Sequence, residues 1–468
     1  MSLTARFAAE LLDLARTPLD DATRQIASAL VVDGLSVAAL GAGETGPRLL
    51  AEATLATGCK PVSTIIGHGI GTSSAGAAMA NGAAMHVLDY EPMWNPANHS
   101  LSTTLPALLA LAEVEEDDPA ATPTRPLGER IFSALSIGIE AQARLRLSSG
   151  QFEPADLIFH PPGAVGSIGS AVASGIFVGL DHAQMTHAIG IAASRAGGIL
   201  ANAGSMTKAL HCGQAAAAGL ESALLARNGF TADADALAGP RGFGTAFFRD
   251  RFDPDRLFGT GAPLNIVSPG PAFKFYPSQY GTHFIITAAL AARTKLPKDA
   301  DIRRVRIISP SMPYVDRPNP ASGLAGKFSF QYTAAVAILD GQVDVASFTD
   351  ARRFAPDLAA LLPKIVIEPD ASREGRFDRM AVDMVIDLGD GTQVEGRCDG
   401  PPGIWGRPAD VDRLKVKARD CLVAAFGTEH GLRVFSLTET VGDIDHRGLA
   451  SLMKALATAV GRSHTNAE

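Results

Sequence analysis

The 468-residue chain has few cysteines and no excess of positive charge. Its four cysteines lie far apart, which excludes a dense disulfide framework and the close spacing typical of zinc sites. Ordinary thiols of this kind indicate a reducing compartment. Lysine and arginine number 41 against 49 aspartates and glutamates, for a formal net charge of −8. Because a phosphate backbone is bound by concentrated positive charge, we expect no nucleic-acid partner.

The sequence also lacks a long apolar run. No stretch reaches the roughly 18 to 20 uninterrupted apolar residues that a membrane-spanning helix requires, so we expect no membrane partner. The first segment, MSLTARFAAELLDLAR, contains Glu10 and Asp13, which interrupt what would be a signal-peptide core. Acidic residues are also unusual in organelle transit peptides. We therefore expect a cytoplasmic protein.

Three stretches that differ in composition and in the spacing of apolar residues predict the fold. Residues 1–266 are rich in Ala, Leu, Gly and Ser, with apolar spacings near three to four that favour helices. Residues 267–408 mix strand-like runs with helical segments, and residues 409–468 are helical again. The pattern predicts a mainly α protein with an α+β lid. A large all-helical domain, 1–266 plus 409–468, is interrupted by a smaller α/β domain, 267–408, with a mostly antiparallel sheet.

Several elements are predicted individually. Strands are expected over 302–310 and 364–369, and a hairpin over 380–398. Helices are expected near 127–147, 280–293 and 331–339. Thr17 followed by Pro18 predicts a helix N-terminus that is capped by the threonine hydroxyl.

Several familiar catalytic motifs are absent. The small-residue segment 69–90 has neither the Lys-Ser/Thr ending of a P-loop nor a dinucleotide fingerprint after a strand. We expect a helix there, whose small residues let neighbouring backbones approach closely. No GxSxG elbow and no HExxH motif occur, and Asp89 with His99 alone is too sparse to hold a metal. We therefore expect a mechanism without a metal or any other cofactor.

Five segments carry polar side chains next to prolines or glycines. They are HVLDYEPMWNPANHS (86–100), LIFHPPGAVGSIG (157–169), GSMTKALHCGQAAAAG (204–219), FKFYPSQYGTHF (273–284) and GKFSFQYTAAVAILDG (326–341). If the segments converge, their lysines and histidines would neutralise a small substrate with two or three carboxylates. An acid or base beside these cations would abstract a proton next to a carboxylate, or protonate the resulting carbanion-like intermediate.

The order of these segments resembles the MmgE/PrpD family over nearly the whole chain. The most specific pieces are HVLDYE followed by NHSLSTTLPALLALAE, then FHPPGAVGSIG, SMTKALHCGQAAAAGLESALLARNGFTA, FKFYPSQYGTH and KFSFQYTAAVAILDG. The resemblance implies a helical domain interrupted by a smaller lid, with the active site between them. It also implies a homodimer and catalysis without a cofactor.

The resemblance further implies which side chains lie in the cleft. They are Asp89, His99, His160, Lys208, Lys274 and Tyr332. Asp89 and Lys208 would carry out proton transfer or support it electrostatically, and His99 would be the acid or base partner. His160 and Lys274 would bind carboxylates.

Two positions depart from the decarboxylase branch of the family. That branch has a threonine where this chain has Met93, and a histidine where this chain has Gln279. Because a neutral amide cannot donate a proton as an imidazolium does, the loss makes cis-aconitate decarboxylation less favoured. His283 is a candidate replacement, although as a helical neighbour of Gln279 it could equally face the core. Met93 near the site suggests an apolar part of the substrate or a narrowed pocket.

The leading hypothesis is a cofactor-independent lyase that removes water from a hydroxylated di- or tricarboxylate of the 2-methylcitrate or citrate type. An isomerase or epimerase of a dicarboxylate such as iminodisuccinate is the alternative, followed by a decarboxylase of the cis-aconitate type. A non-catalytic binding protein with the same fold is the remaining class. The first three share a carbanion-like intermediate, so the residue types alone separate them poorly.

Overall fold

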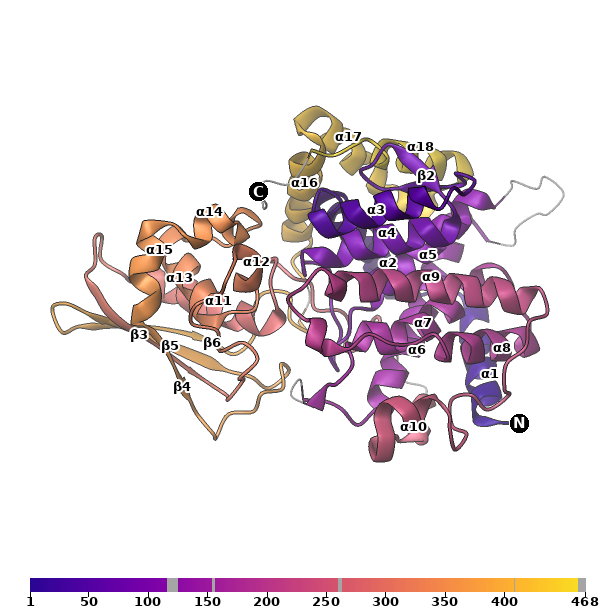
Figure 1. Ribbon diagram of the computed structural model, residues 1–468, viewed down its shortest axis with the longest axis horizontal. Helices are drawn as coiled ribbons and strands as arrows, with labels where there is room; N and C mark the ends of the chain where they lie inside the picture. Colours follow the sequence, from indigo (N-terminus) through magenta and orange to yellow (C-terminus); the bar gives the residue numbers. More distant parts are fainter. Residues whose placement is uncertain (116–124, 154–155, 260–262, 408, 462–468) are drawn as a thin grey trace.

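The computed structural model describes residues 1–115, 125–153, 156–259, 263–407 and 409–461. Figure 1 shows a large helical part and a smaller part that contains the main sheet, side by side. The smaller part is called the lid below. The predicted class, mainly α with an α/β lid, is confirmed.

The helical part combines both ends of the chain. Its helices are α1 (Leu3–Arg16), α2 (Asp21–Gly41), α3 (Thr45–Ala56), α4 (Ser74–Val87), α5 (Ser100–Val114), α6 (Leu127–Ser148), α7 (Pro161–Phe177), α8 (His182–Ala193), α9 (Thr207–Arg227), α10 (Phe243–Phe248), α16 (Val411–Phe426), α17 (Thr428–Thr438) and α18 (His446–Leu456). Leu422 on α16 and Leu456 on α18 are buried in one hydrophobic core with Leu30 and Leu105. The chain therefore returns to this part after the lid, whereas the exact domain bounds stay a prediction.

One small element of the helical part was not expected. The three-residue strands β1 (Ser63–Ile65) and β2 (Ile70–Thr72) form an antiparallel hairpin before α4. Asn81 on α4 fixes this hairpin, because its side chain accepts a hydrogen bond from the amide of Ile66 and donates one to the carbonyl of Thr64.

Helix α2 begins later than the sequence predicted. Its N-cap is Asp20, whose carboxylate accepts a hydrogen bond from the amide of Thr23 at 2.7 Å, so the assignment of the cap to Thr17 was wrong. A carboxylate three residues closer to the apolar run caps the free amides directly. By length and composition α2 could cross a membrane, but 61% of its apolar window is buried inside the protein.

The small residues of α4 bring three helices together. Figure 1 shows α4, α5 and α9 stacked in the centre of the helical part. A Cβ added to Gly213 on α9 would collide with the carbonyl oxygen of Met79, and one added to Gly82 would lie 2.8 Å from the carbonyl oxygen of Ser102. The expectation of a close-packed helix in segment 69–90 is therefore confirmed for Ser74–Val87, whereas residues 70–72 form β2 instead. The close approach brings the start of α9 next to the end of α4.

The lid is a four-stranded sheet with helices on one face, within the residues described. The strands are β3 (Ile302–Ser309), β4 (Ile365–Pro369), β5 (Val382–Leu388) and β6 (Gln393–Cys398), in the order β4-β3-β5-β6. β4 runs parallel to β3, and the other two pairs are antiparallel, as expected of a mostly antiparallel sheet. The helices are α11 (Tyr280–Arg293), α12 (Gly323–Gly326), α13 (Phe330–Asp340), α14 (Asp350–Arg353) and α15 (Pro356–Leu361). α11 packs on β5 and β6 and carries buried Phe284 and Ile286 into a separate core.

Candidate active site

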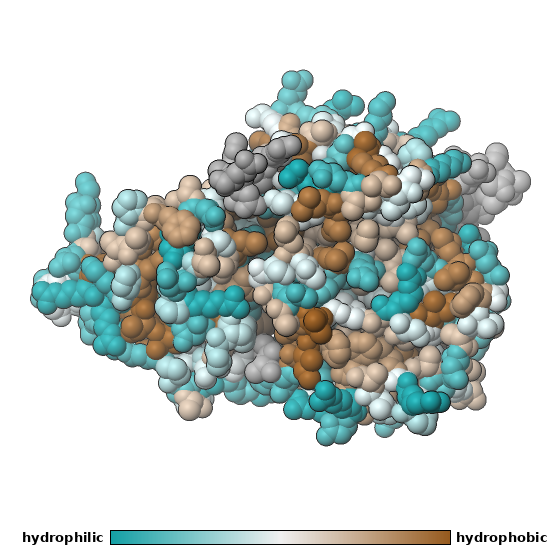
Figure 2. Space-filling view, in the orientation of Figure 1, coloured by the Kyte–Doolittle hydropathy of each residue, from teal (hydrophilic) through white to brown (hydrophobic). Residues whose placement is uncertain are grey.

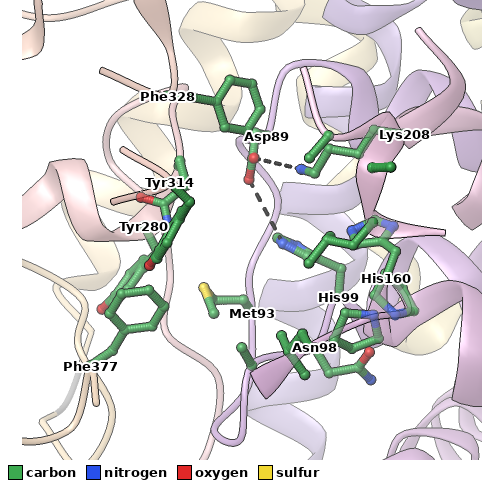
Figure 3. A pocket seen from close by; sticks show the side chains of 18 of the residues that line it. Asp89, Met93, Asn98, His99, His160, Lys208, Tyr280, Tyr314, Phe328 and Phe377 are labelled. Carbon is green, nitrogen blue, oxygen red and sulfur yellow. Dashed lines mark hydrogen bonds and ion pairs between the residues drawn. The ribbon is translucent and has the colours of Figure 1, made fainter. Parts of the chain in front are cut away.

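A pocket of about 610 Å³ lies where loops of the helical part meet the lid. Figure 3 shows Asp89, His99, His160 and Lys208 along one side and Tyr280, Tyr314 and Phe377 along the other. In Figure 2 the surface over this junction carries hydrophobic and hydrophilic side chains next to one another. A volume of this size is in the range that encloses a small organic ligand.

The centre of the pocket is the carboxylate of Asp89. Lys208, in the first turn of α9, donates to Asp89 Oδ2 at 2.7 Å, and Lys274 from the segment before α11 donates to Oδ1. Burial alone would raise the pKa of the Asp89 carboxyl, but the two ammonium groups outweigh it and hold that pKa well below its usual value. Asp89 also adopts a left-handed backbone, with φ of +52°. Such a conformation is costly for a residue with a side chain and is typical of functional sites.

His99 lies between two carboxylates at the start of α5. Its Nε2 is 3.8 Å from Asp89 Oδ1, and its Nδ1 is 3.2 Å from Glu91 Oε1. Glu91 Oε1 also lies 2.5 Å from His86 Nδ1 and accepts a hydrogen bond from Ser102. A carboxylate at Nδ1 favours the tautomer that carries its proton there, which leaves Nε2 directed at Asp89 and the pocket. His99 is therefore oriented for proton transfer through Nε2.

Glu91 was missed by the sequence reasoning. It is fully buried, and the neighbouring imidazoles His86 and His99 overcome burial and hold its pKa well below the usual value. The motif HVLDYE contains a signal for it, namely a second acid two residues after Asp89. A buried carboxylate needs partners, and histidines at both ends of the same segment could have indicated them.

His160 is neutral in this environment. It occupies the N-cap position of α7 without a capping hydrogen bond from its side chain, and its Nδ1 is 3.3 Å from Nδ1 of His211 on α9. Burial, reinforced by the charge of Lys208, lowers the pKa of His160 well below its usual value. His160 can therefore bind a carboxylate through a hydrogen bond, but it adds no positive charge to the pocket.

The structure brings most of the predicted residues together. Those that line the pocket are Asp89, Met93, His99, His160, Lys208, Lys274 and Gln279. Tyr332 is placed elsewhere: it is fully buried in the lid core, and its hydroxyl donates to the carbonyl of Ser347 at 2.6 Å. Since a side chain inside the lid core is shielded from the pocket, the assignment of Tyr332 to substrate binding was wrong.

Lys327 lies near Asp89, on the side away from the main pocket. Its ammonium donates to the carbonyl of Leu88 at 3.2 Å, and burial lowers its pKa to about 8. It lines a separate cavity of about 60 Å³, which meets the main pocket at Asp89 and Lys208. Lys327 therefore adds positive potential behind the carboxylate without facing the main pocket.

Two buried clusters have the ligand types and spacing of a metal site. His86, Glu91 and His99 form one, and His86, His160 and Cys212 form the other, with ligand atoms within 4.8 Å of each other in each. The expectation that Asp89 with His99 alone is too sparse to hold a metal overlooked Glu91, which completes the first cluster. In the first cluster Glu91 Oε1 is bonded to His86 Nδ1 and Ser102, whereas Glu91 Oε2, His86 Nε2 and His99 Nδ1 are buried without a hydrogen-bond partner among the described residues.

Removal of metal is expected to leave turnover unchanged. Asp89 is paired with Lys208 and Lys274, and His86 and Ser102 bind Glu91 Oε1, so both carboxylates at the pocket have protein partners that remain when a cation is removed. The check is to dialyse the protein against a chelator, measure its metal content and compare initial rates before and after. A loss of activity that one divalent ion restores would contradict this expectation.

His283 does not replace the missing histidine of the pocket. It lies on α11 in the lid and is fully buried, with its ring centroid 5.2 Å from that of Tyr276 and 5.0 Å from that of Tyr280. Burial lowers its pKa to about 3. The interpretation of His283 as a core residue is the one that the structure supports.

The variant His283→Phe is expected to resist acid better than the wild type. The unfolded chain binds a proton at this histidine below about pH 6.5, whereas the folded protein rejects it until about pH 3. Stability is therefore lost as pH falls, by about 2 kcal/mol between pH 7.5 and 5. Urea titrations at both values should show a smaller loss in the variant by about that amount. The control Thr294→Ala, at an exposed and non-titrating position just after α11, should keep the wild-type difference, and equal losses in all three proteins would refute the assignment.

Comparisons with known proteins give a consistent result. A family model described as the MmgE/PrpD N-terminal domain matches residues 5–255, and one described as the MmgE/PrpD C-terminal domain matches residues 276–439. The chain is 32% identical to the cis-aconitate decarboxylase of Mus musculus over 428 residues, which are 89% of this chain and 86% of the relative. The human enzyme of the same name is also 32% identical, with 89% and 87% covered. The decarboxylase of Aspergillus terreus (strain NIH 2624 / FGSC A1156) is 25% identical, with 83% of each chain covered.

Proposed function

This chain belongs to the MmgE/PrpD family, and we propose that it is a lyase that removes water from a small tricarboxylate of the 2-methylcitrate or citrate type. The family and the lyases among its relatives support the broad class of a carboxylate lyase. The observation that carries the finer proposal is the Asp89 carboxylate held between Lys208 and Lys274 beside His99. Such a centre combines a base, an acid and concentrated positive charge.

The proposed reaction needs two proton transfers. His99 Nε2 removes the proton from the carbon next to a substrate carboxylate, and negative charge develops on that carboxylate. Lys208 and Lys274 stabilise this charge. The C–O bond to the hydroxyl group breaks, and the Lys208 ammonium donates the proton that converts the leaving hydroxide into water. The product is the unsaturated acid, and proton exchange with solvent restores both side chains.

Two features favour dehydration over loss of CO₂. The pocket holds two proposed proton-transfer groups, and each lies next to a carboxylate: Lys208 is paired with Asp89, and His99 lies beside Glu91. Dehydration uses both, whereas decarboxylation needs only one proton delivered to carbon. Met93 and Gln279 line the pocket at the two positions where the decarboxylase branch has a hydroxyl and an imidazole.

Decarboxylation is the second candidate, because the curated relatives described above are named cis-aconitate decarboxylases. In that reaction a C–C bond breaks, CO₂ leaves and the carbanion takes a proton from Lys208 or His99. The same cations would stabilise the intermediate.

Proton NMR in deuterated water separates these reactions. The purified protein is incubated with citrate, 2-methylcitrate, cis-aconitate and iminodisuccinate in separate samples. Vinylic signals that grow from a saturated acid support dehydration. A product one carbon shorter than cis-aconitate would assign the decarboxylase, and deuterium uptake with inversion would assign an epimerase. No change in any sample would reject the proposed substrate class and leave a binding protein.

A further inference from the structure

Arg317 is a cationic residue of the pocket that comes from the lid. It follows β3 and lines the same cavity as Asp89 and Lys208. Its Nε donates to the carbonyl of Tyr314 at 3.0 Å, and its backbone amide donates to Gln331 Oε1 at 3.2 Å. These two bonds fix Arg317 at its backbone amide and at Nε of its side chain. Among the described residues, no hydrogen bond or ion pair occupies the two terminal nitrogens of the guanidinium, which can therefore receive a ligand.

The guanidinium reaches across the pocket to the helical part. A Cβ added to Gly204, in the loop before α9, would lie 3.6 Å from Arg317 Nη1. On the lid side, Arg317 Cζ is 5.7 Å from the ring centroid of Phe328, and Lys208 Nζ is 5.5 Å from the same centroid. Arg317 and Lys208 therefore lie at neighbouring positions on the wall of one cavity.

Arg317 differs from the two lysines of the site because, among the residues described, they are paired with a carboxylate and it is not. Lys208 and Lys274 share the carboxylate of Asp89, so part of their charge is already neutralised. In the part of the chain that the structure describes, no carboxylate forms an ion pair with Arg317. A half-buried arginine with a planar fork and no anionic partner is well suited to bind a carboxylate in a bidentate manner.

We propose that Arg317 anchors a second carboxylate of the substrate, remote from the carbon that reacts, and thereby selects polycarboxylates over monocarboxylates. The inference rests on the proposed function, because it assumes that a carboxylate next to the reacting carbon occupies the pocket at Lys208 and Lys274. The remote carboxylate then lies on the same wall, beyond Phe328. Binding there adds affinity without taking part in the proton transfers, so it acts on KM more than on kcat.

The test compares the wild type with Arg317→Met and Arg317→Lys on the tricarboxylate that the enzyme turns over. We expect Arg317→Met to raise KM about ten- to hundredfold and to change kcat by less than about threefold, since a hydrogen-bonded charge is lost only from binding. Arg317→Lys keeps the charge but not the fork, and its KM should fall between the two. An analogue with the remote carboxylate replaced by a carboxamide should show a similar KM with wild type and Arg317→Met. Arg303→Met, on the exposed face of β3, is the matched control and should behave as wild type.

The proposal for Arg317 would be overturned if Arg317→Met left the KM for the tricarboxylate unchanged. It would also be overturned if the substitution raised the KM for the carboxamide analogue as much as that for the tricarboxylate. Either result would leave the lyase proposal in place. If the wild type turns over none of the acids, citrate binding is measured by calorimetry. Citrate binding that Arg317→Met weakens at least tenfold would then support the anchor although the lyase proposal fails. Equal binding by both proteins, or no binding by the wild type, would overturn it.

Discussion

Replacing Lys208 with methionine is expected to lower kcat by about 10³-fold or more. Lys208 is the cation of the Asp89 pair that is partly open to the pocket, with 13% of its side chain exposed, whereas Lys274 is fully buried. The substitution removes both the proposed proton donor and half of the positive charge that stabilises the developing carbanion. Folding should be retained, because Lys274 still neutralises Asp89. Steady-state kinetics and thermal unfolding of the same preparation measure the two effects separately.

The control for this prediction is Lys454→Met, which removes an exposed lysine of α18. It should keep both activity and stability. A Lys208→Met enzyme that turns over at more than about a tenth of the wild-type rate would remove Lys208 from the chemistry. If the variant instead unfolds, Lys208→Arg, which keeps the charge at Asp89, separates the loss of structure from the loss of a transferable proton.

Replacing His99 with asparagine is expected to lower kcat by about 10² to 10⁴-fold, the range typical of a lost general base. The buried Glu91 carboxylate keeps its bonds to His86 and Ser102, and the asparagine amide can donate a hydrogen bond toward it. What disappears is the imidazole Nε2 that points at Asp89 and the pocket. The limb of the pH–rate profile that reports the base should disappear together with the rate.

His446→Gln, a histidine of α18 remote from the pocket, is the control and should leave the profile unchanged. The companion variant Glu91→Gln tests how His99 is oriented. Without the carboxylate at Nδ1 the tautomer and ring orientation of His99 lose their support, so kcat should fall while His446→Gln keeps the wild-type rate. A profile that keeps its shape in His99→Asn would transfer the role of base to another residue.

Local features of the chain could be predicted well. Helix α11 was expected near 280–293 and runs from Tyr280 to Arg293, and the strand expected over 302–310 is β3. The hairpin expected over 380–398 is formed by β5 and β6, and its turn contains Gly391 with φ of +88°. These elements depend on periodicity, turn residues and caps that lie within a few positions of each other. The cap of α2 was misplaced because Thr17 and Asp20 both suit an N-cap position, and it is the Asp20 carboxylate that accepts the hydrogen bond from the amide of Thr23.

The candidate site could be predicted only in part. The motifs and the family resemblance indicated Asp89, Lys208 and Lys274, yet the atoms that meet are far apart in the chain: Lys274 binds a carboxylate 185 residues before it. Tyr332 and His283 sit in equally distinctive motifs but are buried in the lid core. A sequence pattern does not show which face of a helix a neighbouring element covers.

The amino-acid sequence by itself determined the elements of this protein, the change from helices to an α/β lid and back, and the residue types that suit a polycarboxylate. The tertiary structure alone decided which charges are paired. It placed Glu91 against two imidazoles and Asp89 between two ammonium groups, and it left Arg317 without an anionic partner in the described part of the chain. The physical reason is that secondary structure follows short-range preferences, whereas burial and electrostatic partners arise only when distant segments pack together.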